Sequence, residues 1–229
     1  PPQNHHYYSW YHFAYSLQTA MKRKRLPMIQ YTFREISCGV QFLGFADERS
    51  ITHSELFADY VNEHLKKYDL IAKEGIRQTD NGVEYCGPWS AKKPSAYTLA
   101  IESAKLTHGT IPPGAHRFQS DVETVHNLIE TEFYEIESFA DRIDFMEKAN
   151  TYQLFFNLER PNTYKENKNP WQLAREKRSD ITKEALMLPS VDLDALLNKK
   201  LAYLVPGGYD VYSAPFNLFA IFSSVPYLS

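Results

Sequence analysis

Cysteine is scarce in this chain, with two residues among 229 positions. A disulfide-stabilised scaffold is therefore excluded, and a reducing compartment fits the chain better. Glycine is also scarce, with nine residues, and neither a glycine-rich phosphate loop nor a G-x-S-x-G turn occurs. No spacing of His and Cys matches a structural zinc site. These absences argue against a phosphate-cradling loop, a nucleophile elbow and a zinc module.

The chain also lacks long apolar runs. No run approaches the ~18 residues that read as a membrane-spanning helix, and the N-terminus has no apolar segment of the signal-peptide type. We therefore expect no membrane association and a cytoplasmic location. The formal net charge is only −3, so any contact with nucleic acid must come from local basic patches. Hydrophobic residues make up 43% and charged residues 23%, which argues against wholesale disorder.

Alternating and helical apolar patterns predict a mixed α/β chain. The expected order is a β-hairpin, helices alternating with short strands, and then further helices, which implies a mixed sheet with helices packed on it. The expected strands cover residues 28–36, 40–46, 75–79 and 107–111, and the expected helices cover residues 50–70, 95–106, 121–139, 143–158 and 170–178. Residues 193–197 are predicted as a short helical turn and residues 201–212 as a pair of strands.

The same periodicity predicts which apolar side chains face the core. The expected core positions are Ile29, Tyr31, Phe33, Phe42, Leu43, Phe45, Leu56, Val61, Leu65, Ile76, Leu99, Ile101, Val125, Leu128, Ile129, Phe133 and Ile136.

Asp80 is the first candidate for chemistry. It directly follows the expected strand 75–79 and begins the sequence Asp80-Asn81-Gly82. An acid at the carboxyl end of a strand in an α/β sheet faces the usual ligand crevice. Asp-Asn-Gly is also an ordinary turn sequence in which Asp is common. The local sequence therefore fits a ligand or a turn.

Glu123 is the second candidate, in the first turn of the expected helix 121–139. Ser120 and Glu123 have the spacing of a capping box, in which the Glu side chain bonds the N-cap amide. The alternative is a metal-binding carboxylate at the helix start. His126 lies on the same face, and an E-x-x-H pair can bind metals in helical bundles.

Asn157 and Arg160 lie at the end of the expected helix 143–158 and are followed by a basic stretch over residues 165–178. Asn and Pro commonly terminate helices, which is one interpretation of the sequence here. The other is a polar platform close to DNA phosphates.

Taken together, these segments resemble the catalytic core of the DDE integrases and transposases. Residues 31–46 resemble the second and third strands of that core, and residues 79–85 (TDNGVEY) resemble the T-D-N-G-x-E-[FY] motif with its second metal-binding Asp. Residues 120–123 (SDVE), followed by residues 130–133, resemble the helix that carries the third acid. Residues 156–171 (FNLERPN, then NPW) resemble the Y-N-x-x-R-P-H…T-P element that closes the core in bacterial insertion-sequence transposases.

The resemblance covers about residues 26–178, in the order that the family has. It implies an RNase H-like fold, a mixed sheet with helices on both faces, followed over residues 179–229 by a short C-terminal extension with β character. It implies metal-dependent cleavage and joining of DNA strands with Mg²⁺ or Mn²⁺, DNA and a second copy of the chain as partners, and a bacterial, nucleoid-associated location. Asp80 and Glu123 would be the catalytic metal ligands. The positions implied to bind DNA are Asn157, Arg160, Lys165, Lys168 and Arg175.

The chain departs from the family at the first acid, which lies on the family's first strand, before the hairpin. No Asp precedes Asp47, and Asp47 follows the third strand instead. We expect the first acid upstream of Pro1, with residues 1–25 as an insertion or a remnant after the missing strand and this fragment inactive. One alternative is a non-catalytic RNase H-like scaffold that binds DNA or protein. Another is a metal-dependent nuclease acting on RNA, which would share the acids but not explain the closing element.

Overall fold

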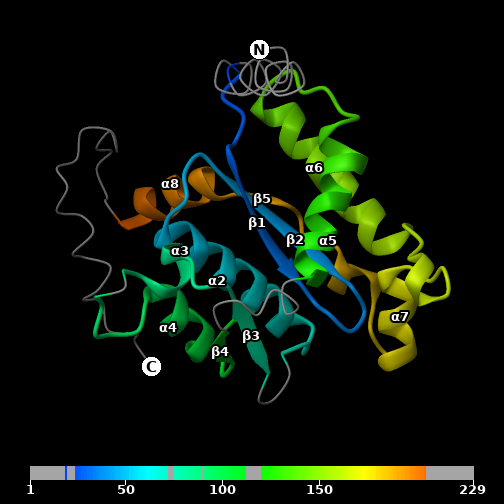
Figure 1. Ribbon diagram of the computed structural model, residues 1–229, viewed down its shortest axis with the longest axis horizontal. Helices are drawn as coiled ribbons and strands as arrows, with labels where there is room; N and C mark the ends of the chain where they lie inside the picture. Colours follow the sequence, from blue (N-terminus) through cyan, green and yellow to red (C-terminus); the bar gives the residue numbers. More distant parts are fainter. Residues whose placement is uncertain (1–18, 20–23, 72–74, 89, 112–119, 205–229) are drawn as a thin grey trace, which may run out of the picture.

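The computed structural model describes residue 19 and residues 24–71, 75–88, 90–111 and 120–204 (Figure 1). Within these residues the chain is a mixed α/β structure. Its strands are β1 (Ile29–Arg34), β2 (Gln41–Ala46), β3 (Ile76–Thr79), β4 (Thr107–Thr110) and β5 (Val191–Asp192). Its α-helices are α2 (Ile51–Lys67), α3 (Val83–Cys86), α4 (Ala96–Ser103), α5 (Ser120–Ile129), α6 (Arg142–Leu158), α7 (Pro170–Lys177) and α8 (Leu193–Leu204). Three short helical turns, η3 (Glu130–Tyr134), η4 (Thr163–Lys165) and η5 (Lys183–Leu186), complete the elements used below.

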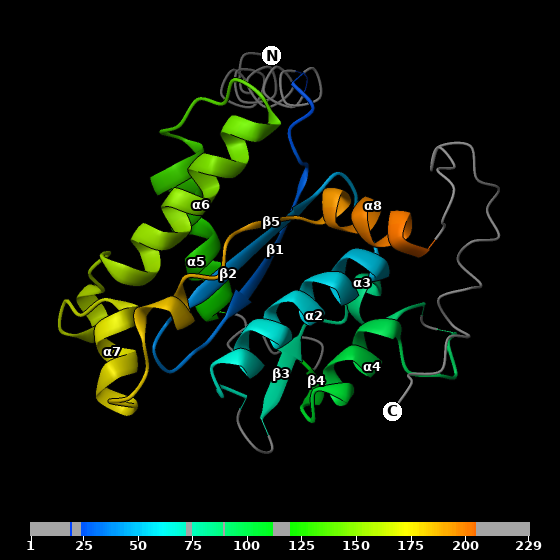
Figure 2. The same ribbon diagram turned by 180° about the vertical axis from the view of Figure 1, so that it is seen from behind.

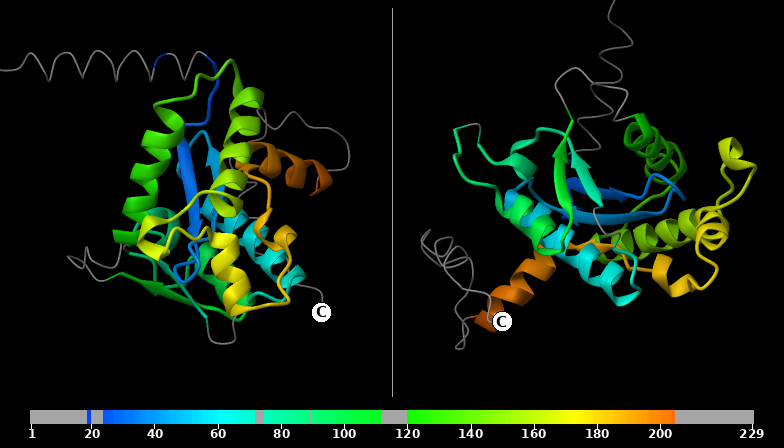
Figure 3. Two further views of the ribbon diagram at one scale, coloured as in Figure 1. Left: turned by 90° about the vertical axis from the view of Figure 1, so that its right-hand side faces the viewer. Right: turned by 90° about the horizontal axis from the view of Figure 1, so that it is seen from below.

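The described strands form two separate sheets. β1 and β2 form an antiparallel hairpin with Phe33 opposite Phe42, and β5 adds to β2 in parallel, so the strand order is β1-β2-β5. Gly39 makes the tight hairpin turn with a positive φ of 83°, a conformation that glycine adopts without a Cβ clash. β3 and β4 form a parallel pair. In the right-hand view of Figure 3 this pair crosses the direction of β1 and β2.

Both faces of β2 are buried, which explains its nearly continuous apolar sequence. Phe42 packs with side chains of α2 and α8, whereas Leu43 and Phe45 pack with side chains of α5 and α6. In Figure 1, α2, α4 and α8 lie to the left of the strands and α5, α6 and α7 to the right. Helices therefore lie on both faces of the β1-β2-β5 sheet, as expected, whereas β3 and β4 do not join that sheet as the prediction of one mixed sheet required.

Helix α2 connects the two parts of the molecule. One face packs against the β1-β2-β5 sheet, and Ala58 on another face packs against Tyr97 and Ile101 of α4. Figure 2 shows α2 from behind, with β3 and α4 beneath it. No described helix combines the length and the apolar character that a membrane span requires.

Three predicted core positions are wrong. Ile76 is 72% exposed because β3 pairs only with β4 among the described strands, and this face of the pair is uncovered. Leu99 points away from α2 on the outer face of α4 and is 54% exposed. Ile136 lies beyond the helical segment, which ends with the π-helical turn η3, and is exposed.

The segment after residue 178 differs from its expected β character. Leu201–Leu204 continue α8, whereas residues 201–212 are predicted as a strand pair. The rest of that prediction and residues 205–229 lie outside the described residues, as does most of the segment 1–25. Leu186 and Leu193 share a core with Phe42 and Val61, so this segment packs on the same sheet as the hairpin.

Candidate functional site

Asp80 directly follows β3, at the carboxyl end of the parallel β3–β4 pair, and its side chain is exposed. The N–H of Gly82 donates to Asp80 Oδ1 at 2.9 Å, which is an Asx-type turn. Asn81 Nδ2 donates to the carbonyl of Ile111 at 2.8 Å and ties the loop to the end of β4. No described residue donates a hydrogen bond to Asp80 Oδ2. The turn and ligand interpretations of Asp80 are therefore compatible, because one oxygen makes the turn and the other is open.

Side chains at the starts of α2 and α4 hydrogen-bond the loop that follows Asp80. Ser54 on α2 donates to the carbonyl of Glu84, and Ser95 at the N-cap of α4 donates to the carbonyl of Tyr85. A Cβ at Gly82 would lie 2.5 Å from Glu84 Oε2 and 2.9 Å from Asp80 Oδ1, so glycine leaves room for both carboxylates there. The loop is thus a tightly hydrogen-bonded support for one exposed acid.

Glu123 is exposed on α5, two residues before Val125, which together with Ile129 is buried against the sheet. His126 Nε2 lies 3.2 Å from Thr32 Oγ1, which places this part of α5 over β1. Burial lowers the pKa of His126, and the negative charge of Glu123 opposes that effect. The side chain of Ser120 is outside the described residues, so the capping-box interpretation of Glu123 stays a prediction.

Asp80 and Glu123 therefore both present exposed carboxylates in the described part of the chain. The described residues do not contain a cluster of three or more His, Cys, Asp or Glu in a metal-binding arrangement. Oxygen ligands of this kind suit Mg²⁺, which takes one or two carboxylates and keeps several waters. The carboxylate oxygens of Asp80 and Glu123 are ligands of this type, and that the two acids share one metal site stays a prediction.

Asn157 is fully buried, with 0% of its surface exposed. Its Oδ1 accepts the N–H of Gln41 at 3.0 Å, and its Nδ2 donates to the carbonyls of Gln41 at 2.8 Å and Leu186 at 3.1 Å. One turn earlier on α6, Gln153 accepts the N–H of Leu43 at 2.6 Å. The expectation that Asn157 contacts DNA is therefore corrected, because a side chain with no exposed surface cannot reach a phosphate.

Arg160 is also engaged inside the protein. Its Nε and Nη2 donate to the two carboxylate oxygens of Glu132 at 2.7 and 2.6 Å, a bidentate fork. These hydrogen bonds raise the pKa of Arg160, and its guanidinium also lies 5.3 Å from the ring centroid of Phe156. This geometry gives Arg160 a structural role through its pairing with Glu132, and the predicted DNA contact of Arg160 stays a prediction.

The remaining predicted DNA contacts differ in availability. Lys165 Nζ donates to the carbonyls of Ile36 and Ser37 at 3.2 and 3.0 Å, at the tip of the β1–β2 hairpin. Lys168 pairs with Glu166 and Glu176, both within 2.9 Å. Arg175 is exposed on α7, where its guanidinium stacks over Trp171 with 5.7 Å to the ring centroid. Arg175 is thus the member of the predicted set with the freest cation.

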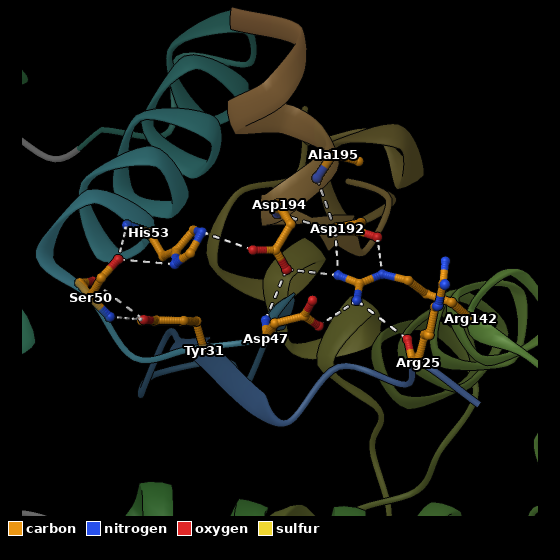
Figure 4. A network of polar contacts seen from close by, with 9 residues as sticks. All are labelled: Arg25, Tyr31, Asp47, Ser50, His53, Arg142, Asp192, Asp194 and Ala195. Carbon is orange, nitrogen blue, oxygen red and sulfur yellow. Dashed lines mark hydrogen bonds and ion pairs between the residues drawn. The ribbon is translucent and has the colours of Figure 1, made fainter. Parts of the chain in front are cut away.

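A second polar cluster, which the sequence did not reveal, lies where β2 ends and α6 and α8 begin (Figure 4). Arg142 at the start of α6 donates from Nη2 to Asp192 Oδ1 at 2.8 Å and to Asp194 Oδ2 at 2.7 Å, and it also bonds Asp47. The bond to Asp192 is the main reason that the pKa of Arg142 is raised. The contributing residues are far apart in the sequence, so no spacing pattern predicts the cluster.

His53 links this cluster to the start of α2. Its Nε2 lies 3.1 Å from Asp194 Oδ1, and its Nδ1 lies 2.9 Å from Ser50 Oγ (Figure 4). Burial lowers the pKa of His53, but the carboxylate of Asp194 outweighs burial and raises it above 6.5. Burial alone would raise the pKa of Asp194, but hydrogen bonds from His53, Asp47 and Arg142 outweigh burial and lower that pKa to about 2. Ser50 Oγ accepts the N–H of His53 as the N-cap of α2, so the trio is a capped helix start that anchors α8.

Neither a scan against protein-family models nor a search of curated proteins finds a match for this chain.

Proposed function

We propose that this chain is the catalytic core of a DNA integrase or transposase of the DDE type, with an RNase H-like fold. The observation that carries the proposal is the placement of Asp80. Its carboxylate is exposed at the carboxyl end of a parallel strand pair, with one oxygen fixed by the Gly82 amide and the other open. That is where α/β folds place residues that act on ligands.

The order of elements supports the same proposal. An antiparallel hairpin is followed by α2, by the parallel strands β3 and β4, and by a helix that packs on the hairpin and carries Glu123. Among the described strands, one edge of β1 and one edge of β3 have no strand partner. A further strand bearing the first acid would therefore find open edges here, since unpaired strand edges are templates for strand addition.

In this function Asp80 and Glu123 would hold divalent cations through carboxylate oxygens. Such ions, when bound, supply an activated oxygen nucleophile and stabilise the leaving oxygen of the phosphodiester. The hydrogen bond from the Gly82 N–H to Asp80 Oδ1 would fix the orientation of the carboxylate, so that Oδ2 faces the solvent. Arg175 on α7 would contribute a phosphate contact that positions DNA without reading its sequence.

The test uses the full-length protein with DNA ends and Mg²⁺ or Mn²⁺. Asp80→Asn and Glu123→Gln should each lower strand cleavage on the order of 100-fold or more, because metal ions contribute several kcal/mol to the transition state. Their thermal unfolding should change little, since both side chains are exposed. Glu135→Gln, which replaces another exposed acid beyond η3, is the matched control and should retain activity.

A second candidate function is a non-catalytic scaffold that binds DNA or a partner protein. It is favoured by the burial of Asn157 and by the internal pairing of Arg160 and Lys168, which leaves fewer of the expected DNA contacts free. DNA binding without metal-dependent cleavage by the natural protein would support this scaffold. Cleavage of RNA in place of DNA would instead support the nuclease alternative, and full activity of Glu123→Gln would remove Glu123 from the site.

A further inference from the structure

His108 on β4 lies beside the Asp80 loop and uses both ring nitrogens. Its Nε2 lies 2.8 Å from Thr79 Oγ1 at the end of β3, and its Nδ1 lies 2.8 Å from Thr98 Oγ1 on α4. The ring also packs edge-on against Tyr97, with 5.0 Å between ring centroids. His108 thus joins β3 to α4 through a half-buried imidazole with a fixed orientation.

Each of these contacts continues to one end of the Asp80 loop. Thr79 Oγ1 donates to the carbonyl of Asp80 at 3.0 Å. On the other side, Thr98 Oγ1 lies 3.0 Å from Ser95 Oγ, which donates to the carbonyl of Tyr85. The imidazole therefore lies between the two ends of the Asp80 loop, in contact with Thr79 on one side and with Thr98 on the other.

The position of the proton on the His108 ring decides to which acceptor the Thr79 hydroxyl donates. A carbonyl only accepts, so Thr79 can donate to Asp80 only if His108 Nε2 donates to Thr79. Burial lowers the pKa of His108, so the ring donates from one nitrogen near neutral pH. With the proton on Nε2, Thr79 donates to the Asp80 carbonyl, and Nδ1 accepts the hydroxyl proton of Thr98, which then does not donate to Ser95. With the proton on Nδ1, the Thr79 hydroxyl donates to the ring instead of to Asp80.

We propose that His108 is a positioning residue for Asp80 and acts through Thr79. The inference rests on the proposed function, because it assigns His108 to the site in which Asp80 would bind a metal ion. The polar side-chain contacts of His108 go to Thr79 and Thr98, one residue short of Asp80 on the β3 side. The role of His108 is to fix the backbone at Asp80, so that the Gly82 N–H donates to Asp80 Oδ1 and Asp80 Oδ2 stays accessible to a metal ion.

Two substitutions separate this role from simple packing. Gln places its amide near the position of the histidine Nε2, so His108→Gln keeps the contact with Thr79 and loses the contact with Thr98. Asn places its amide near the position of Nδ1, so His108→Asn does the reverse. Positioning through Thr79 requires that the Gln variant resembles the wild type and the Asn variant does not, whereas a role in packing β4 on α4 requires the opposite ranking.

The first measurement is the amide NMR signal of Gly82 in the whole chain, because that N–H donates to Asp80 Oδ1. We expect the Gly82 signal to shift in His108→Asn and in Thr79→Val, and to stay near its wild-type position in His108→Gln and in Thr98→Val. Thr110→Val is the matched control, since Thr110 is the exposed register partner of Thr79 on β4. An unchanged Gly82 signal in both His108→Asn and Thr79→Val would overturn the inference.

The second measurement is metal-dependent strand cleavage by the natural protein. His108→Asn and Thr79→Val should lower the rate by roughly 10-fold to 100-fold, the scale that small misplacements of catalytic groups produce. His108→Gln should retain most of the rate, and the reverse ranking of Gln and Asn would overturn the inference. Absence of cleavage in the wild type would refute the proposed function, and the Gly82 signal would still decide whether His108 positions Asp80.

Discussion

Replacing Asn157 with alanine should cost far more stability than the same change at the half-buried Asn150 of α6. The substitution leaves three buried groups without partners: the N–H and the carbonyl of Gln41 and the carbonyl of Leu186. A buried hydrogen bond contributes about 1–1.5 kcal/mol, and unpaired buried groups cost at least as much. The expected loss in the free energy of unfolding is therefore about 3–4.5 kcal/mol.

The matched control is Asn150→Ala on the same helix. Asn150 is half-buried and accepts one hydrogen bond, from the N–H of Ser190 at 3.1 Å, so its loss should cost about 1 kcal/mol. Both substitutions introduce alanine into a helix and gain the same helix propensity, which cancels in the comparison. The difference between the two variants then reports on the buried contacts of Asn157.

The assay is urea unfolding followed by circular dichroism, with the slope of each transition compared among the variants. A protein of this kind has a total stability of about 5–15 kcal/mol, so the expected loss for Asn157→Ala is large and easily measured. Equal losses for Asn157→Ala and Asn150→Ala would refute the reasoning, because they would show that the amide contacts with Gln41 and Leu186 contribute nothing.

Three further changes test other parts of the structure. Asp194 raises the pKa of His53, so the pair contributes its full stabilisation below pH 6.5 and loses it as the pH rises through the folded-state pKa of His53. The free energy of unfolding of the wild type, measured between pH 5 and 8, should therefore fall with rising pH, and Asp194→Asn should remove this fall. Gly44→Ala should destabilise by about 1–3 kcal/mol, because the new Cβ would lie 2.7 Å from Phe57 Cδ2, and a thermal melt at or above that of the wild type would contradict this packing. Arg142→Lys should cost about 1–2 kcal/mol in urea unfolding, since an ammonium cannot make the forked contacts that the guanidinium makes, and an unchanged midpoint would show that charge alone suffices.

The sequence predicts the local elements well because local periodicity determines them. The predicted strands 28–36 and 40–46 and the predicted helices 50–70 and 143–158 match β1, β2, α2 and α6 within a few residues at each end. Where prediction fails, the deciding contacts are distant in sequence. Ile76 has the pattern of a core residue, but its burial depends on a neighbour that the described strands do not supply.

The candidate site shows the same division. Asp80 could be placed at a strand end from its own neighbourhood, since the turn sequence and the strand adjoin it. The roles of Asn157 and Arg160 could not, because the motif that contains them does not show that Gln41 and Glu132 are their partners. A polar residue in a motif has the same letter whether it faces a ligand or the core, and only the three-dimensional contacts distinguish the two.

The side-chain amides of Gln153 and Asn157 have a consequence for assembly. A side-chain amide carries the same donor and acceptor as a peptide group, and two of them one turn apart on α6 meet alternate residues of β2. The helix therefore satisfies that edge of β2 as a neighbouring strand would, where β5 is too short to do so. A satisfied edge no longer recruits strands from other molecules. Two residues of a helix thus protect this side of the sheet against edge-to-edge aggregation.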